Sequence, residues 1–149
     1  FVVNPDIKFI EKVDLDTVVQ NLENDKLDIS SPEIIGPSGQ IEDYKRADLK
    51  IFNLIKRKML GLHKERFEWF AGMFLVIKST GYRKLRGFDI SYFMYVEDCD
   101  LCMRARKAEM VLGDIKNFSV EHDARRASMK RANHLRWHVA SLVRYWFSK

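Results

Sequence analysis

Three carboxylates occupy four consecutive positions in the second half of the chain. Glu97, Asp98 and Asp100 follow an aromatic run and precede a helical pattern. Carboxylates this close repel one another unless a helix N-terminus, a metal ion or a cation stabilises them. At least one is therefore expected to have a shifted pKa and to be suited to acid–base chemistry. A structural alternative stays open, because acids in the first turn of a helix also complement the helix dipole.

Smaller features elsewhere in the chain could also carry chemistry. Asn4-Pro5-Asp6 follows an apolar triplet, but these residues also form ordinary strand-ending turns. His122 ends an alternating apolar segment, where a histidine without any ligand role is the simpler interpretation. Cys99 and Cys102 form a Cys-x-x-Cys pair, yet the neighbouring acids disfavour a thiolate and no second pair completes a zinc site. We therefore expect two buried free thiols there.

Composition favours one globular domain. The chain has 149 residues, of which 46% are hydrophobic and 32% charged, with 3 Pro and 7 Gly. No apolar run approaches the roughly 20 residues of a membrane-spanning helix, and no secretory signal pattern opens the chain. The β-prone opening Phe1-Val2-Val3 lacks a Met and leads into a turn, so we expect a fragment whose first element is a core strand.

The net charge of +5 is concentrated at the C-terminal end. Seven Lys or Arg residues and no acids follow residue 123, so the first 123 residues carry a net charge of −2. We accordingly divide the chain into a body, residues 1–124, and a basic amphipathic helix within residues 125–149. A basic tail suits an anionic partner, either phospholipid or nucleic acid, and composition alone does not separate the two.

Hydrophobic periodicity predicts a mixture of strands and helices, which indicates an α/β fold. Strands are expected over residues 1–3, 34–35, 69–77, 92–96, 111–112 and 118–120. Helices are expected over residues 15–22 with an Asp14 cap, 42–62, 101–108 and 128–147, with turns at 36–39 and 79–81.

Several of these segments together resemble a known family. Trp69 to Ile77, Gly87-Phe88-Asp89, and Tyr92 to Leu101 with Arg104 are similar to the second half of family 2 inverting glycosyltransferases, in the bacterial rhamnosyltransferase-like branch. The resemblance extends over most of residues 1–122. It implies a partial GT-A fold, a Rossmann-like sheet that lacks its N-terminal nucleotide-binding half of about 90 to 100 residues. A chain without that half is not expected to transfer sugar alone.

The resemblance also implies a catalytic role for the acidic cluster. Asp98 would be the general base that takes the proton of the acceptor hydroxyl, and Glu97 would shape its pKa and position. Asp100 would cap the helix or orient a neighbour. Trp69 and Gly72 would line the acceptor site, since glycine allows a sugar to approach the backbone closely.

A donor and metal site follows from the same resemblance. Asn4 and Asp6 occupy the place of the family's Asp-x-Asp signature and would contact the nucleotide-diphosphate sugar. Asp6 would bind a divalent metal, Mg²⁺ or Mn²⁺, and His122 would complete that site.

The implied function is transfer of a sugar from a nucleotide-diphosphate donor to a glycan or lipid-linked acceptor, with inversion, in cell-surface polysaccharide synthesis. Deoxythymidine-diphosphate rhamnose is the donor that the resemblance suggests. We expect a cytoplasmic protein whose final helix contacts the anionic inner face of the cell membrane, and a homodimer through the exposed strand Phe1–Val3. The alternative is a basic nucleic-acid-binding or noncatalytic interaction module. Nucleic acid is not the expected partner, because the acidic cluster would repel phosphate.

Overall fold

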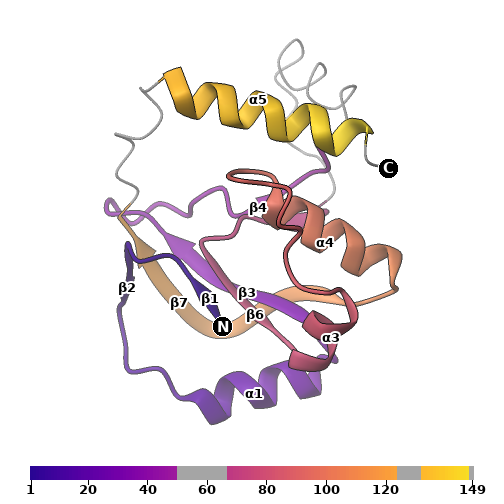
Figure 1. The fold of residues 1–149 in the computed structure, drawn as a ribbon. Helices are drawn as coiled ribbons and strands as arrows, with labels where there is room; N and C mark the ends of the chain where they lie inside the picture. The colour runs from indigo at the N-terminus through magenta and orange to yellow at the C-terminus, as the bar shows by residue number, and fades with distance from the viewer. Residues whose placement is uncertain (50–66, 124–131, 148–149) are drawn as a thin grey trace.

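The computed structural model describes residues 1–49, 67–123 and 132–147. Its centre is a five-stranded sheet in the order β1-β6-β3-β7-β2, and a second sheet pairs β4 with β5. The strands are β1 Val2–Val3, β2 Ile7–Phe9, β3 Ile29–Ile35, β4 Lys45–Arg46, β5 Trp69–Phe70, β6 Phe74–Ile77 and β7 Leu112–His122. The helices are α1 Leu15–Asn24, α3 Ser79–Lys84, α4 Glu97–Lys107 and α5 Ala132–Phe147. Figure 1 shows α1 below the sheet, with α4 and α5 above it. A mixed α/β architecture is thereby confirmed.

Strand direction determines which residues meet at each edge of the large sheet. β6 runs antiparallel to both β1 and β3, and β7 runs parallel to β3. β1, β3 and β7 therefore share one direction, and their carboxyl ends lie along the same edge. β1 is itself an outer strand, and Phe1 beside it is 62% exposed.

Helix α1 begins where the sequence predicts. The carboxylate of Asp14 accepts hydrogen bonds from the Asp16 backbone N–H at 3.1 Å and from the Thr17 hydroxyl at 2.6 Å. The first of these bonds satisfies a backbone N–H that the first helical turn leaves unpaired, and the second holds the Asp14 side chain in place. Val18 and Leu22 of α1 are buried, as the apolar spacing predicts.

The apolar run from Trp69 to Ile77 is buried but does not form one strand. It divides into β5 and β6, which belong to different sheets. The break lies at Ala71 and Gly72: the Ala71 N–H donates to the Tyr44 carbonyl, and the Gly72 N–H donates to the Asp98 carboxylate. Because these hydrogen bonds go to acceptors outside one strand ladder, the backbone bends between β5 and β6. A continuous run of apolar residues in the sequence does not indicate such a bend.

The strand predicted over Tyr92–Val96 is wrong. Tyr95 and Val96 have φ angles of 69° and 73°, in the left-handed region, whereas strands require strongly negative φ. The helix predicted over residues 42–62 is also wrong where the structure describes it, because Lys45–Arg46 forms β4. Residues 50–62 of that prediction lie outside the described residues.

Other element predictions differ in extent. Residues 111–112 and 118–120 do not form two separate pieces: Leu112–His122 is a single strand, β7, with a register shift against β3 and a φ of 56° at Asn117. The turn predicted at 79–81 opens α3, and β2 was not predicted. The final helix is described over Ala132–Phe147, while residues 128–131 of the prediction lie outside the described part. Within that part, no helix is long and apolar enough to cross a bilayer.

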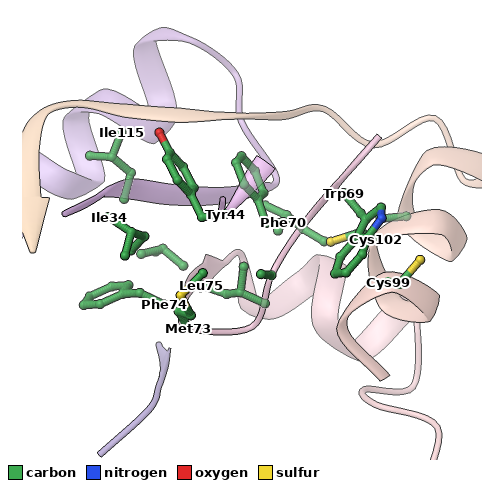
Figure 2. Packing of buried hydrophobic residues seen from close by; sticks show 14 of the residues in the cluster. Ile34, Tyr44, Trp69, Phe70, Met73, Phe74, Leu75, Cys99, Cys102 and Ile115 are labelled. Atoms are coloured by element: carbon green, nitrogen blue, oxygen red, sulfur yellow. The ribbon is translucent and has the colours of Figure 1, made fainter. Parts of the chain in front are cut away.

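The core lies between the large sheet, the β4–β5 sheet and α4. Figure 2 shows Ile34 of β3 with Phe74 and Leu75 of β6, and the two cysteines on α4. Cys99 and Cys102 are fully buried free thiols, which confirms that prediction. Burial raises the pKa of Cys102 to about 12 and raises that of Cys99 as well, so neither thiol is suited to redox chemistry.

Candidate functional site

The candidate site lies at the edge of the large sheet where its parallel strands end. The Asn4 N–H, just after β1, donates to the Met73 carbonyl at 3.0 Å. Ile35, the last residue of β3, lies beside Glu121 of β7, and His122 ends β7. Ligands in open α/β sheets bind at the carboxyl ends of parallel strands, so this edge is the place to look for chemistry.

Asp98 reaches this edge from the first turn of α4. Its Oδ2 accepts a hydrogen bond from the Gly72 N–H at 2.7 Å, and its Oδ1 accepts one from the Cys99 N–H at 2.8 Å. Burial raises the pKa of Asp98, while these two backbone hydrogen bonds and the Arg46 charge partly offset that rise. The carboxylate is thus fixed in position and more basic than an ordinary Asp.

Gly72 is part of this arrangement because of its size. A Cβ atom added at Gly72 would lie 3.3 Å from the Asp98 Cβ and 3.4 Å from its Oδ2. The 3.3 Å carbon–carbon separation is shorter than the roughly 3.5–4.0 Å of a comfortable carbon contact, and the 3.4 Å separation from the oxygen is at the limit of ordinary contact. The absence of a side chain at residue 72 therefore lets the backbone N–H approach the carboxylate.

The other two acids of the cluster have different surroundings. Burial raises the pKa of Glu97, and the Asp98 charge raises it further. Its Oε2 is buried without a hydrogen-bond partner among the described residues. Asp100 instead accepts a hydrogen bond from Arg104 Nε at 2.7 Å, and Arg104 also donates to the carbonyls of Leu85 and Gly87. The N-cap position of α4 belongs to Val96, so Asp100 contacts a neighbour rather than occupying the cap.

Asp6 and His122 meet although 115 positions separate them in the printed sequence. His122 Nε2 lies 3.3 Å from Asp6 Oδ2, because β2 pairs with the end of β7. Asp6 Oδ1 and His122 Nδ1 are buried without a hydrogen-bond partner in the described part of the chain. A carboxylate oxygen and an imidazole nitrogen form a donor set that fits a divalent cation, above all Mn²⁺. Among residues 1–49, 67–123 and 132–147, no third Asp, Glu, His or Cys completes a ligand group.

A pocket adjoins this pair. It has a volume of about 520 Å³ and is lined by Asn4, Pro5, Asp6, Ile7, Lys8 and Asp123. The Lys8 ammonium at its rim lies 2.9 Å from a Glu121 oxygen and 3.5 Å from an Asp123 oxygen. Asn4 and Asp6, the predicted donor-binding residues, thus face a common space.

Trp69 lies away from solvent. The residue is 3% exposed, and its indole Nε1 donates to the Ala47 carbonyl at 2.6 Å. The Arg46 guanidinium lies 5.4 Å from the ring centroid. These contacts are enough to account for a tryptophan at this position through packing. The predicted role of Trp69 in lining an acceptor site stays a prediction.

Sequence reasoning missed two ionisable groups near Asp98, Arg46 and His138. Arg46 lies close enough to lower the pKa of Asp98, and it falls within the segment wrongly predicted as a helix. Burial lowers the pKa of His138 on α5, Arg46 lowers it further and the Asp98 charge raises it. No signal in the sequence relates either residue to Asp98, because the three come from separate elements.

Comparison with known proteins finds rhamnosyltransferases among the relatives of this chain. The chain is 29% identical over 158 residues to Rhamnosyltransferase WbbL of Escherichia coli (strain K12), a match that covers 95% of this chain and 59% of the relative. It is 34% identical over 74 residues to N-acetylglucosaminyl-diphospho-decaprenol L-rhamnosyltransferase of Mycobacterium tuberculosis (strain ATCC 25618 / H37Rv), which covers 49% of this chain and 24% of that protein.

The chain therefore spans less than two thirds of the length of these relatives. No protein-family model matches the chain, and no solved structure matches it either. The similarity to rhamnosyltransferases over nearly the whole chain supports its assignment to a glycosyltransferase family.

Proposed function

We propose that the chain forms the acceptor and metal side of a family 2 glycosyltransferase with a GT-A fold. The complete protein would transfer a rhamnosyl group from a nucleotide-diphosphate sugar to a glycan or lipid-linked acceptor, with inversion, in polysaccharide synthesis. The observation that carries the proposal is the placement of the Asp98 carboxylate, held by the Gly72 N–H, at the sheet edge that also gathers Asp6 and His122.

Asp98 would act as the general base. As the acceptor hydroxyl oxygen attacks the anomeric carbon, its proton passes to the Asp98 carboxylate, and the bond to the diphosphate breaks on the opposite face of the sugar. A raised pKa suits this role, since a carboxylate that is more basic than usual accepts a proton more readily. Glu97, with its own raised pKa and unpartnered Oε2, would adjust the charge beside the base.

Asp6 and His122 would hold a divalent cation, Mg²⁺ or Mn²⁺. The buried, unpartnered atoms of both side chains support this assignment. Such an ion, when bound, neutralises the charge of a diphosphate leaving group. Asn4 and Asp6 would contact the donor from the pocket that they line. Trp69 would support the acceptor wall from behind Gly72, since the indole itself is buried.

Helix α5 would contact the cytoplasmic face of the membrane. Exposed apolar side chains recur along it at a spacing of four residues: Leu135, Val139, Val143 and Phe147. Arg136 and Arg144 are exposed on the same helix, and the range Ala132–Phe147 contains no acid. An apolar stripe with flanking cations suits an anionic lipid surface. A nucleic-acid-binding module would explain these cations but not the acidic cluster at the sheet edge.

The test of the proposed reaction is Asp98→Asn in the complete protein. We expect transfer from deoxythymidine-diphosphate rhamnose to fall by about 10²- to 10⁴-fold, the usual contribution of a general base. Calorimetric binding of the donor should be unchanged. Asp16→Asn, an exposed acid on α1, is the matched control and should retain full transfer. Turnover of Asp98→Asn at the wild-type rate would refute the role.

A further inference from the structure

The segment immediately before the acidic cluster has an unfavourable backbone. Tyr95 and Val96 have φ angles of 69° and 73°. Residues other than glycine rarely adopt this left-handed conformation, and a β-branched residue such as Val adopts it least readily. The conformation ends one residue before Glu97, so it sets the direction in which α4 starts. Contacts elsewhere must stabilise it.

Helix α5 supplies those contacts. The Ser141 hydroxyl is buried and donates to the Met94 carbonyl at 2.8 Å. The Tyr95 hydroxyl lies 2.8 Å from His134 Nδ1, which joins the first left-handed residue to the start of the helix. Three ring contacts add to these bonds: Phe93 with Trp137 at 5.1 Å, Tyr95 with His138 at 5.2 Å, and Arg144 over Tyr92 at 5.9 Å.

The far end of α5 is anchored to the body of the domain. Tyr145, at 2% exposed, donates its hydroxyl proton to the Asp48 carboxylate. The Trp146 indole N–H donates to the Leu49 carbonyl at 2.7 Å. A helix fixed at this end can support the 92–96 segment as a rigid element instead of following its motion.

We propose that α5 is a positioning element for Asp98. Ser141 and His134 hold Met94 and Tyr95 so that the chain keeps its left-handed path through Val96, and this path places the Asp98 carboxylate at the Gly72 N–H. The inference rests on the proposed role of Asp98 as base. It adds that Ser141 and His134 affect the reaction by fixing the backbone that positions Asp98, and that they do not contact the substrate.

The first test is Ser141→Ala in the complete protein, with kcat and KM measured for transfer from deoxythymidine-diphosphate rhamnose. Loss of one neutral hydrogen bond that orients the base should lower kcat by about three- to tenfold. The KM for the donor should change by less than about twofold, because Ser141 lies outside the donor pocket. Thr17→Ala is the matched control: it removes a hydroxyl hydrogen bond to Asp14 on α1 and should leave kcat unchanged.

The second test separates positioning from general destabilisation. Val96→Gly and Val96→Ala are each combined with Ser141→Ala, and both truncate a side chain that is 4% exposed. Glycine adopts positive φ without penalty whereas alanine does not. The Gly double variant should therefore recover kcat toward the wild-type value by about threefold or more relative to the Ala double variant, although it has the smaller side chain. The kcat is expressed per folded molecule, because glycine at positive φ also favours the folded state; a purely structural role for Ser141 then predicts equal kcat for the two double variants.

Two outcomes would overturn the inference. One is wild-type kcat for Ser141→Ala while Asp98→Asn abolishes transfer, which would leave the proposed function intact. The other is a Val96→Gly double variant that is no more active than its Val96→Ala counterpart. If Ser141→Ala does not fold by circular dichroism, Tyr95→Phe replaces it, since that change removes only the hydroxyl that meets His134. The same fall in kcat is then required.

Discussion

Replacing Gly72 by Ala should impair the base without removing it. The new Cβ would lie 3.3 Å from the Asp98 Cβ and 3.4 Å from its Oδ2. Asp98 cannot turn away at no cost, because its two oxygens accept hydrogen bonds from Gly72 and Cys99 at 2.7 and 2.8 Å. A shift of a few tenths of an ångström that relieves this tight contact is therefore expected to lengthen the hydrogen bond from the residue 72 N–H.

The size of the effect follows from that bond. A hydrogen bond to a charged group contributes about 1.5–3 kcal/mol, and a tenfold change in rate corresponds to about 1.4 kcal/mol. If the base loses this bond in the reactive geometry, kcat should fall by roughly 10- to 100-fold. The pH profile should move as well. The Gly72 bond lowers the pKa of Asp98, so weakening it raises that pKa, and the acidic limb of kcat shifts to higher pH.

The assay is steady-state sugar transfer by the complete protein across pH 4 to 9 in approximate steps of one unit, with donor saturating. Two glycine variants serve as controls. Gly113→Ala would place a Cβ 2.7 Å from a Leu27 methyl group, a steric conflict remote from Asp98, and Gly81→Ala meets only Met110 at 3.6 Å. Both should retain the acidic limb of the wild type. The reasoning is refuted if Gly72→Ala keeps both the wild-type kcat and the wild-type acidic limb of the kcat–pH profile. It is also refuted if Gly113→Ala shifts that acidic limb by the same amount as Gly72→Ala.

Other expected outcomes concern the metal pair, the membrane and the anchor of α5. Chelation with EDTA should abolish transfer by the complete protein, and added Mn²⁺ should restore it. The double variant Asp6→Asn with His122→Ala should stay inactive after Mn²⁺ is added. Full transfer activity in EDTA would contradict the metal assignment. Co-sedimentation of the complete protein with anionic liposomes should weaken in Arg136→Glu combined with Arg144→Glu, and binding indifferent to these changes would count against lipid contact. Tyr145→Phe should lower the free energy of unfolding by about 1–3 kcal/mol in denaturant titration, because it removes a hydrogen bond from a buried carboxylate; an unchanged midpoint would show that the bond contributes nothing.

The homodimer expected through the exposed edge of β1 stays a prediction. β1 is the outer strand of the large sheet, and Val3 is 38% exposed beside the more exposed Phe1. An unpaired strand edge with apolar side chains permits pairing with another strand. A homodimer through this edge is expected to dissociate when Val3 is replaced by Pro, because the hydrogen bond from the Asn4 N–H to the Met73 carbonyl and the antiparallel register leave the Val3 N–H facing the open edge. Gel filtration with light scattering would measure the change.

The sequence by itself determined the elements whose signals are local. Asp14 was identified as a helix cap, because a short acidic side chain before helical apolar spacing bonds to its own next turn. The burial of the Trp69–Ile77 run and the mixed α/β class follow in the same way, and so does a helix after the aromatic run, although the prediction placed it over residues 101–108 and α4 spans Glu97–Lys107. Each depends on residues within a few positions of one another, and such patterns are readable without any knowledge of the partner segments.

Only the tertiary structure decided where the apolar segments go and which functional groups meet. Tyr92–Val96 has strand-like composition, yet bonds from Ser141 and His134 hold it in a left-handed path. The Trp69–Ile77 run enters two sheets because Gly72 donates to Asp98 from another element. Asp6 meets His122 only because β2 pairs with the end of β7. Such contacts join residues distant in sequence, and their free energy depends on the whole packed arrangement, so no local pattern specifies them.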